Sequence, residues 1–232
     1  MFLRVFLFNI LLYFSILFFG IIFLPFIFSR KIITEVVRIW ARIIIASLKI
    51  ILGIEVKFND KYVKNKSGII VAANHQSAFD TIFFLAAFEK TIYIIKKELI
   101  FIPIYGWYAI RLGNIFIDRE KRIESVKKLS KSVKMMIDRG YNVIIFPEGT
   151  RHTSGIIGNL KPGVFLLQNA VKKPIYPIFI NSGYAWPKNS LNMKKENILI
   201  KSLKPIPYGL QKKSFKKTLE DRLKKTNEEY NS

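Results

Sequence analysis

An uncharged stretch near the amino terminus constrains the fold of this chain more than any other feature of the sequence. Residues 5–29 contain no Asp, Glu, Lys or Arg. As an α-helix they would extend roughly 37 Å, which exceeds the ~30 Å hydrocarbon core of a bilayer. A secretory signal peptide has a shorter apolar core and a small-residue cleavage site, and this stretch has neither. We therefore expect a membrane-inserted helix that is not removed, with Pro25 near its end.

The following residues predict a second helix, over residues 34–52, which Thr34 and Gly53 are suited to begin and end. Most of its surface is apolar. A helix with a basic stripe and a wide apolar face is typical of the membrane interface. A buried helix packed on the rest of the protein, or a hairpin of both helices in one leaflet, has the same pattern. The charged residues fall on one narrow stripe: Glu35, Arg38, Arg42 and Lys49.

The charge balance constrains the partners and the orientation of the chain. There are 38 Lys and Arg residues against 16 Asp and Glu residues, a net charge of +22. Such a chain attracts anionic lipid headgroups, nucleic acid or acidic carrier molecules, and the apolar amino terminus favours lipid. Arg30 and Lys31 directly follow the uncharged stretch, so we expect the body of the protein on the cytoplasmic side of the membrane.

The sequence has no cysteine and only two histidines, His75 and His152. Disulfides, thiolate metal sites, a cysteine nucleophile and a three-histidine zinc site are therefore excluded. No residue pattern requires a metal or a resident cofactor. Chemistry that needs an imidazole base has two candidates.

From residue 54 onward, short β-type runs alternate with helical segments. Several runs are continuously apolar, as expected of central strands that are covered on both faces. This alternation predicts an α/β domain with a mixed, largely parallel sheet flanked by helices. The expected strands are residues 54–58, 69–73, 92–95, 114–117, 142–146, 175–180 and 198–202.

Two helices are singled out between these strands. Residues 81–88 are short and apolar, and residues 123–137 carry apolar side chains every three or four positions before Gly140. The Lys-rich carboxyl terminus predicts a basic surface helix that frays at its end. The expected units are, in order, the membrane helix with the interfacial helix (1–53), the α/β domain (54–210) and the basic C-terminal helix (211–232).

A histidine and an aspartate follow the strand expected at 69–73. In α/β domains, functional groups collect where a strand ends and the next loop or helix begins. His75 and Asp80 are five residues apart with a turn between them, so the carboxylate can reach one imidazole nitrogen while the other faces a substrate. A carboxylate held this way fixes the tautomer and stabilises the cation of a histidine that acts as general base. A helix-capping aspartate beside a surface histidine has the same spacing.

A second polar segment, Phe-Pro-Glu-Gly-Thr-Arg at 146–151, follows another expected strand. Gly149 permits a tight turn and a close backbone approach. Arg151 carries a planar guanidinium group that suits phosphate. A turn with a surface arginine is the simple alternative for this segment alone.

Taken together, these segments resemble the glycerolipid acyltransferase family, whose members include the 1-acyl-sn-glycerol-3-phosphate acyltransferases. His75 and Asp80 match the H-x4-D motif of that family, and residues 146–151 match its FPEGTR motif. The resemblance covers about residues 69–181. His152 is a departure, since many members have a small polar residue there, and we interpret it as a loop residue. Further blocks in family order are residues 96–99 with Pro103 and Gly106, 113–119, 161–163 and 174–178.

The resemblance implies direct acyl transfer from a thioester to the free hydroxyl of a lysophospholipid such as lysophosphatidic acid, forming phosphatidic acid. His75 would take the proton of the hydroxyl, and Asp80 would orient His75 and balance its charge. Ser77 is not expected to be a nucleophile, because no G-x-S-x-G elbow surrounds it. Backbone N–H groups near the His75 or Gly149 turns are expected to hold the oxyanion.

The resemblance also implies a set of substrate contacts. Arg151, Lys96 and Arg119 are expected to contact the phosphate of the acceptor. Glu148 is expected to bond the glycerol hydroxyls or to hold a basic neighbour, and Asp118 to pair with Arg119 or a nearby lysine. The expected substrate-binding residues are Lys96, Arg119, Glu148, Gly149, Thr150 and Arg151.

Membrane lipid, the lysolipid and an acyl donor, either acyl-coenzyme A or acyl carrier protein, are the expected partners. Other acceptors of the same family are lyso-ornithine lipid, another lysophospholipid and glycerol 3-phosphate. A lipid esterase, with water as acceptor, shares the residue chemistry. A basic membrane-associated protein that binds nucleic acid is the non-enzymatic alternative, but no helix-turn-helix, zinc-finger or RNA-binding motif is present, and no nucleic acid is expected. The acyl donor, chain length, oligomeric state and span against hairpin stay open.

Overall fold

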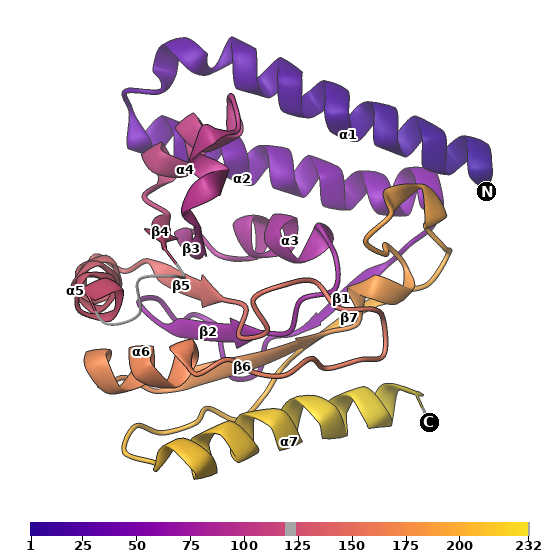
Figure 1. Cartoon of the computed structure of the whole chain (residues 1–232). Helices are drawn as coiled ribbons and strands as arrows, with labels where there is room; N and C mark the ends of the chain where they lie inside the picture. Colours follow the sequence, from indigo (N-terminus) through magenta and orange to yellow (C-terminus); the bar gives the residue numbers. More distant parts are fainter. Residues whose placement is uncertain (119–123, 232) are drawn as a thin grey trace.

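The computed structural model describes residues 1–118 and 124–231. Within these residues, seven strands form one sheet with helices on both faces (Figure 1). The strands expected from the sequence are confirmed, each within two residues at its ends. They are β1 (Val56–Asn59), β2 (Ile70–Ala73), β3 (Thr91–Lys96), β4 (Ile115–Ile117), β5 (Asn142–Ile145), β6 (Ile175–Ile180) and β7 (Ile198–Ser202).

The strand order is β1-β7-β6-β2-β5-β3-β4. The pairings from β6 across to β4 are parallel, β7 is antiparallel to β6, and β1 is parallel to β7. The expectation of a mixed, largely parallel sheet is therefore confirmed. The chain leaves β2 toward β3 on one side but leaves β5 toward β6 on the other. Because β2 and β5 are neighbours, the loops that follow them diverge, which is where α/β folds place their sites.

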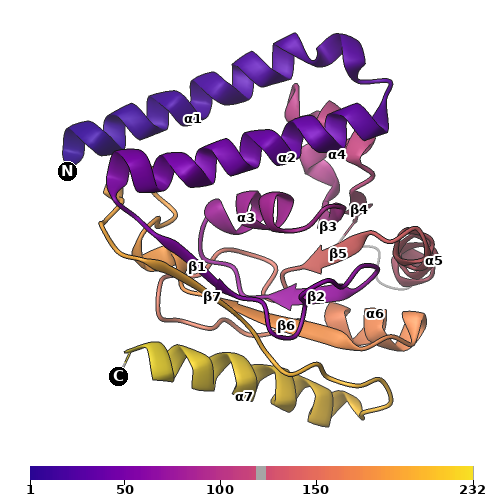
Figure 2. The same cartoon turned by 180° about the vertical axis from the view of Figure 1, so that it is seen from behind.

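Helices cover both faces of the sheet. α3 (Phe79–Ala87) and the N-terminal helices lie on one face, and α6 (Gly163–Val171) and α7 (Lys212–Asn231) lie on the other. The view from behind shows the same layers (Figure 2). α3 and α5 (Glu124–Asp138) confirm the two helices singled out from the sequence, whereas α4 (Tyr105–Leu112) and α6 were not singled out.

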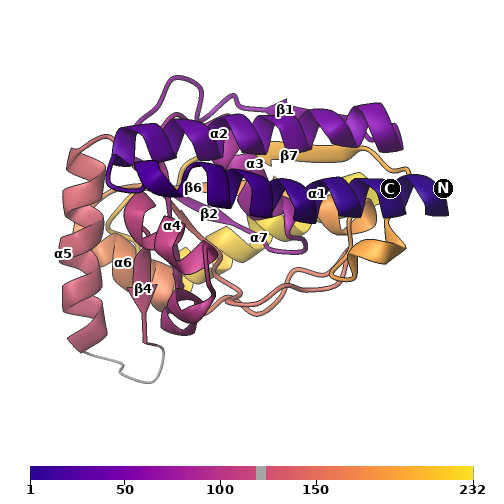
Figure 3. The same ribbon diagram turned by 90° about the horizontal axis from the view of Figure 1, so that it is seen from above.

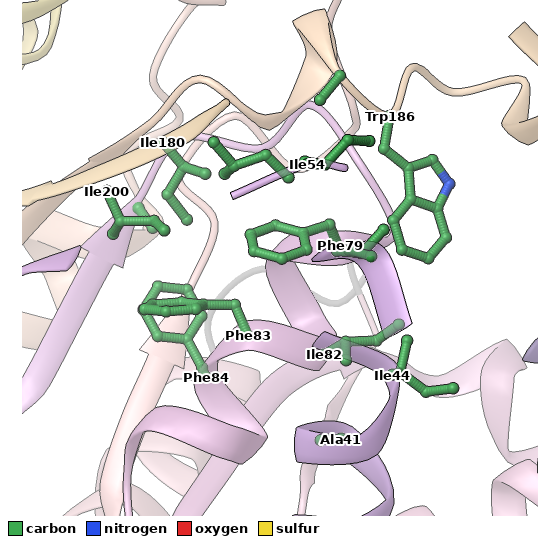
Figure 4. Packing of buried hydrophobic residues seen from close by; sticks show 14 of the residues in the cluster. Ala41, Ile44, Ile54, Phe79, Ile82, Phe83, Phe84, Ile180, Trp186 and Ile200 are labelled. Atoms are coloured by element: carbon green, nitrogen blue, oxygen red, sulfur yellow. The ribbon is translucent and has the colours of Figure 1, made fainter. Parts of the chain in front are cut away.

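The apolar strands supply side chains to two core layers. Val71 and Ala73 of β2 point into the layer under α3, while Ile70 and Ala72 point into the layer above α7. Figure 4 shows the first layer, in which aromatic side chains of α3 pack against residues of the sheet and of the N-terminal helices. This two-sided burial explains why the central strands are continuously apolar.

The basic C-terminal helix α7 is packed more firmly than a surface helix. Phe215, Leu219 and Leu223 are buried in the second core layer, because they recur every four residues on one face. The lysines occupy the opposite, exposed face. α7 therefore completes the cover of the sheet on the face opposite the N-terminal helices (Figure 1).

The two N-terminal helices have other boundaries than the sequence predicted. α1 (Phe2–Ile22) ends well before residue 29, because Pro25 sits in the 3₁₀ turn η1 (Leu24–Phe26) and cannot donate to a continuing helix. α2 (Arg30–Ser47) begins four residues earlier than expected. Its cap is the Ser29 hydroxyl, which accepts from the Ile32 N–H, while the Thr34 hydroxyl donates to a carbonyl inside the helix.

α2 continues as the π-helical turn η2 (Leu48–Leu52) and ends, as predicted, at Gly53, whose φ of 68° is left-handed. α1 and α2 lie side by side over the sheet as an antiparallel pair (Figure 3). Among the described residues, α1 is the one helix long and apolar enough to cross a membrane by length and composition.

α1 lies along the α/β domain over its whole length. Near its start, the Phe8 ring meets Trp186 edge to face with 5.2 Å between centroids. Near its end, the Tyr108 hydroxyl donates to the Gly20 carbonyl at 3.0 Å. These contacts agree with the hairpin alternative, because a helix held to the domain at both ends does not project from it. Membrane insertion itself stays a prediction.

Candidate active site

His75 and Asp80 meet at the end of β2. His75 lies in the loop that follows β2, and Asp80 lies in the first turn of α3. The His75 Nδ1 and an Asp80 carboxylate oxygen are 2.8 Å apart. Asp80 is completely buried, whereas the His75 side chain keeps 16 % of its surface exposed. The imidazole can therefore be reached from outside while its carboxylate partner cannot.

The Asp80 carboxylate is saturated with donors. The oxygen that faces His75 also accepts from the backbone N–H groups of Gln76 and Ser77, at 2.8 and 2.9 Å. The other oxygen accepts from the Ser182 hydroxyl at 2.5 Å. These donors hold the carboxylate in one orientation against the imidazole. Asp80 thus orients His75 and is suited to stabilise its cation.

The His75 ring is also fixed from its face. Phe146, the first residue after β5, stacks on it with ring centroids 4.0 Å apart. The stacking and the Asp80 contact together leave the Nε2 edge of the ring for a substrate. Because Phe146 belongs to the neighbouring strand's loop, the site depends on the pairing of β2 with β5.

Glu148 clamps the His75 loop to the loop after β5. One carboxylate oxygen accepts from the His75 N–H at 2.8 Å and the other from the Gly158 N–H at 2.9 Å. Burial raises the pKa of Glu148, and these two N–H groups, with His152 and His75, act in the opposite direction. Of the two roles expected for Glu148, the 3.6 Å distance between its carboxylate and the His152 Nε2 fits a basic neighbour, while contact with the glycerol hydroxyls stays a prediction. Glu148 is a positioning residue for His75.

His152 takes part in the same clamp, although the sequence predicts only a loop residue at this position. Its backbone N–H donates to the His75 carbonyl at 2.8 Å. Its Nε2 lies 3.6 Å from a Glu148 oxygen. A Cβ at Gly158 would lie 2.2 Å from the His152 ring, so only glycine leaves room for the histidine. Both the N–H and the C=O of His75 are thus held by the segment after β5.

The residues expected to meet the phosphate are only partly brought together. Arg151 is half-buried in the loop that carries Glu148, and within residues 1–118 and 124–231 its side chain forms no ion pair. Lys96 is exposed at the carboxyl end of β3, on the same sheet edge but two strands from β2. Arg119 lies outside the described residues. Asp118 pairs with Lys97 at 2.5 Å, which confirms the lysine partner expected for it.

The turn after β5 has the backbone that its sequence requires. Gly149 has a φ of 73°, a left-handed conformation that favours glycine. Thr150 follows it in the same turn. In the described part of the chain, no group of three or more His, Asp or Glu side chains is placed to hold a metal ion.

Three further residues of the site were not found from the sequence. Asn74 exchanges two hydrogen bonds with the backbone of Ile180, at 2.7 and 2.8 Å, and so joins the β2 loop to the end of β6. Ser182 binds Asp80, and the Gly183 N–H donates to the Gln76 side chain at 3.1 Å. Their position in the sequence could have indicated this role, because Ser182 and Gly183 come just after the strand expected at residues 175–180.

The Ser77 hydroxyl makes a structural hydrogen bond, which agrees with the expectation that Ser77 is not a nucleophile. Its hydroxyl is buried and accepts from the Phe79 N–H at 3.1 Å, at the start of α3. The N–H groups of His75, Gln76 and Ser77 all bind carboxylates. The His75 turn therefore offers none of these three amides to an oxyanion.

An apolar cavity of about 210 Å³ lies beside the dyad, between α1, α2, α3, α4 and β3. Thr81, which follows Asp80, and Tyr93 line it, and the Tyr93 hydroxyl donates to the Thr81 carbonyl. Tyr93 is also stacked on Phe146 at 6.3 Å between centroids. The rings of Tyr93 and Phe146 thus lie between this end of the cavity and His75.

A fixed His–Asp pair at a strand end is suited to remove a proton from a hydroxyl group or from water. The family model described as Acyltransferase matches residues 54–181, which is more than half of the chain. The chain belongs to this acyltransferase family.

The similar proteins agree with this family. A 1-acyl-sn-glycerol-3-phosphate acyltransferase of Pseudomonas aeruginosa is 32 % identical over 153 residues, 66 % of this chain and 60 % of that protein. The protein of the same name from Saccharomyces cerevisiae is 31 % identical over 173 residues, 72 % of this chain and 57 % of that protein. The chain thus spans about 60 % of the length of these relatives.

The fold has a solved counterpart. The crystal structure of the 1-acyl-sn-glycerophosphate acyltransferase PlsC from Thermotoga maritima matches with a TM-score of 0.79 at 23 % identity. The match covers 99 % of this chain and 95 % of that one. The likeness includes the N-terminal helices, so the arrangement of the helical pair over the α/β domain is shared.

Glu148→Gln tests the clamp. The amide would place its NH₂ against one of the two N–H donors, leaving a buried donor unpaired at a cost of about 1–3 kcal/mol. We expect the free energy of unfolding to fall by that amount in denaturant titration. The rate of acyl transfer should fall as well, because the His75 backbone is released. The exposed Glu228→Gln is the matched control, and equal behaviour of the two variants would contradict the clamp.

Ser182→Ala tests the donor on the far side of Asp80. A hydrogen bond to a charged group contributes about 1.5–3 kcal/mol, so we expect kcat to fall roughly tenfold or more with KM unchanged. Ser182→Thr, which keeps the hydroxyl, should restore much of kcat. Ser202→Ala removes another buried hydroxyl with two backbone partners, outside the site. If Ser202→Ala lowers kcat as much as Ser182→Ala, the effect is one of stability and the positioning role is wrong.

Proposed function

We propose that this protein transfers an acyl chain from a thioester to the free hydroxyl of a lysophospholipid. The observation that carries the proposal is the His75–Asp80 pair, with a buried, donor-saturated carboxylate behind a reachable imidazole. The names of the similar proteins favour lysophosphatidic acid as the acceptor and phosphatidic acid as the product. Acyl carrier protein and coenzyme A thioesters are both suitable donors.

The reaction follows from the geometry of the pair. The His75 Nε2 removes the proton of the acceptor hydroxyl as its oxygen attacks the thioester carbonyl carbon, and the carbonyl oxygen becomes an oxyanion. Asp80 stabilises the imidazolium that forms. The intermediate then collapses, the carbon–sulfur bond breaks, and the leaving thiolate takes the proton from His75. The new ester and a free thiol are the products.

The oxyanion needs donors that are not already in use. The His75, Gln76 and Ser77 amides bind carboxylates, and the Gly149 amide donates to the Phe146 carbonyl at 3.0 Å. Of the two turns predicted to hold the oxyanion, the turn after β5 has the N–H groups of Thr150 and Arg151, which donate to no group within residues 1–118 and 124–231. We assign the oxyanion to these two amides.

The acceptor would lie with its phosphate toward basic groups on the carboxyl edge of the sheet. Arg151 is the closest of these in the chain to the clamp and offers two parallel N–H donors to phosphate. Lys96, which is exposed at the end of β3, lies on the same edge, and the contact of Arg119 with the phosphate stays a prediction. The apolar cavity beside Thr81 and Tyr93 is suited to an acyl chain, because its lining is overwhelmingly hydrocarbon.

The helical pair supports a location of the site at a membrane surface. α1 exposes large apolar side chains along the side that does not contact the domain, such as Phe14 and Ile21. We propose that α1 and α2 insert into one leaflet as a hairpin, with the catalytic domain on the cytoplasmic side. Lysolipid acceptors could then reach the site without full extraction into water.

Acyl transfer from labelled acyl-coenzyme A and acyl carrier protein to lysophosphatidic acid tests this function, with membranes that contain the wild-type protein or His75→Ala. We expect the wild type to form phosphatidic acid and His75→Ala to lose the activity by several orders of magnitude. The control variant Lys217→Ala, which changes an exposed residue of α7 outside the site, should retain the wild-type activity.

Each other result of this assay has a definite meaning. Acylation of another lysolipid, but not of lysophosphatidic acid, would correct the acceptor. Release of free fatty acid without an acceptor would indicate an esterase. Transfer by His75→Ala at the wild-type rate would contradict the mechanism.

A further inference from the structure

A second apolar surface lies outside the two N-terminal helices, on the segment formed by the 3₁₀ turn η3 (Lys97–Phe101) and α4 (Tyr105–Leu112). Phe101 is 82 % exposed and Trp107 is 48 % exposed, which is unusual for aromatic side chains of this size. The exposed apolar residues of this segment are Phe101, Ile102, Tyr105, Trp107 and Ile110. A concentration of this kind on one short segment marks an interaction surface.

The segment is attached to the carboxyl end of α1. The Tyr108 hydroxyl donates to the Gly20 carbonyl at 3.0 Å. The Ile104 side chain packs so closely on Gly20 that a Cβ there would lie 2.6 Å from it. α4 rises from the sheet on the same face as α1 and α2 (Figure 1), and it packs against α2 as well as against the end of α1.

The apolar surface of α1 therefore continues onto this segment. The carboxyl half of α1 exposes large apolar residues next to the contact with α4, among them Phe18, Ile21 and Ile22. A single bilayer surface that covers α1 would reach α4 as well, because the two elements touch and lie on the same face of the sheet. A soluble protein partner would have to cover the exposed apolar side chains of α1 and of the η3–α4 segment at the same time.

The composition of the segment suits the boundary between lipid headgroups and acyl chains. Trp107 and Tyr105 belong to the residue types that are enriched at membrane interfaces. Basic residues flank the apolar ones in sequence, with Lys96 and Lys97 before them and Arg111 after them. Such residues favour anionic headgroups.

The backbone of the segment is held in one conformation. Ile104 has a φ of 63°, a left-handed value that is strained for a β-branched residue and persists only where packing determines it. Gly106 lies against the Ile100 carbonyl so closely that a Cβ would be 2.0 Å from its oxygen. The exposed aromatic side chains are thus presented by a rigid turn, which lowers the entropic cost of inserting them.

We propose that the η3–α4 segment is a second membrane-contacting element, which inserts Phe101, Ile102 and Trp107 into the lipid interface beside α1. The apolar cavity lies between this segment and α1, since Tyr105 and Tyr108 line it on one side and Phe19 and Gly20 on the other. The rim of the cavity would then face the hydrocarbon of the leaflet directly. The use of the cavity rim by an acyl chain rests on the proposed function. Membrane contact by the segment does not depend on it.

Site-specific labelling tests the contact without any measurement of activity. The chain has no cysteine, so an environment-sensitive fluorophore can be attached to Phe101→Cys alone in the full-length protein. With vesicles of phosphatidylcholine and phosphatidylglycerol, we expect a blue shift and strong quenching by brominated acyl chains. Phe18→Cys on α1 is the positive control. Lys217→Cys on α7, on the opposite face of the sheet, should show neither change.

The outcome is decisive in both directions. Quenching at residue 101 comparable to that at residue 18 supports the proposal. Quenching at residue 18 with none at residue 101 overturns it, and leaves the proposed function untouched. Absence of quenching at both positions overturns the membrane placement of α1 and of the segment together.

A charge placed on the segment tests its use in the reaction. We expect Phe101→Asp to lower transfer to lysophosphatidic acid in vesicles about tenfold, with little effect in detergent micelles. Tyr208→Asp changes another exposed aromatic residue, in the turn before α7, and should leave both assays unchanged. Equal loss in vesicles and micelles would indicate damage to the fold and would contradict a role at the lipid surface. If wild-type protein is inactive in both assays, the proposed function fails while the labelling result stands.

Discussion

The buried Asp80 carboxylate is the constraint on which the rest of the site depends. A charge without contact to water is stable only if donors surround it, and Asp80 obtains them from the His75 ring, two amides of the β2 loop and the Ser182 hydroxyl. These donors come from the segments after β2 and β6. Glu148 adds the segment after β5 by binding the His75 N–H. Three neighbouring strands therefore have to be in register before the imidazole has its position.

Most of the fold follows from the sequence because burial determines the pattern of the strands. Central strands with both faces covered are mostly apolar, and β2, β5 and β6 are so, apart from Asn142 at the start of β5 and Tyr176 in β6. The end of α1 and the start of α2 did not follow. Apolar residues continue through the turn at Pro25, so hydropathy alone could not reveal that α1 stops at Ile22. Pro25, which has no N–H to donate, ends α1, and the Ser29 cap sets the start of α2.

The parts of the site that could be predicted are those in which reactive side chains follow a strand. Side chains whose role is to hold the backbone or another side chain in place were harder to predict. His75 and Asp80 were found because a base and a carboxylate followed a strand at a suitable spacing. The clamp by Glu148 was not, because its two partners are backbone N–H groups, which no residue pattern in the sequence marks. Ser182 lies about a hundred residues from Asp80 in the chain, so only the sheet order brings it there.

The most direct test of this account is the coupling between His75 and Asp80 in acyl transfer, measured as kcat for His75→Ala, Asp80→Asn and the double variant. If Asp80 acts only through His75, the double variant should be no slower than His75→Ala alone, because groups that act as a unit are not additive. Multiplied losses in the double variant would contradict the account, since they would show that Asp80 contributes to the reaction independently of the histidine that it holds.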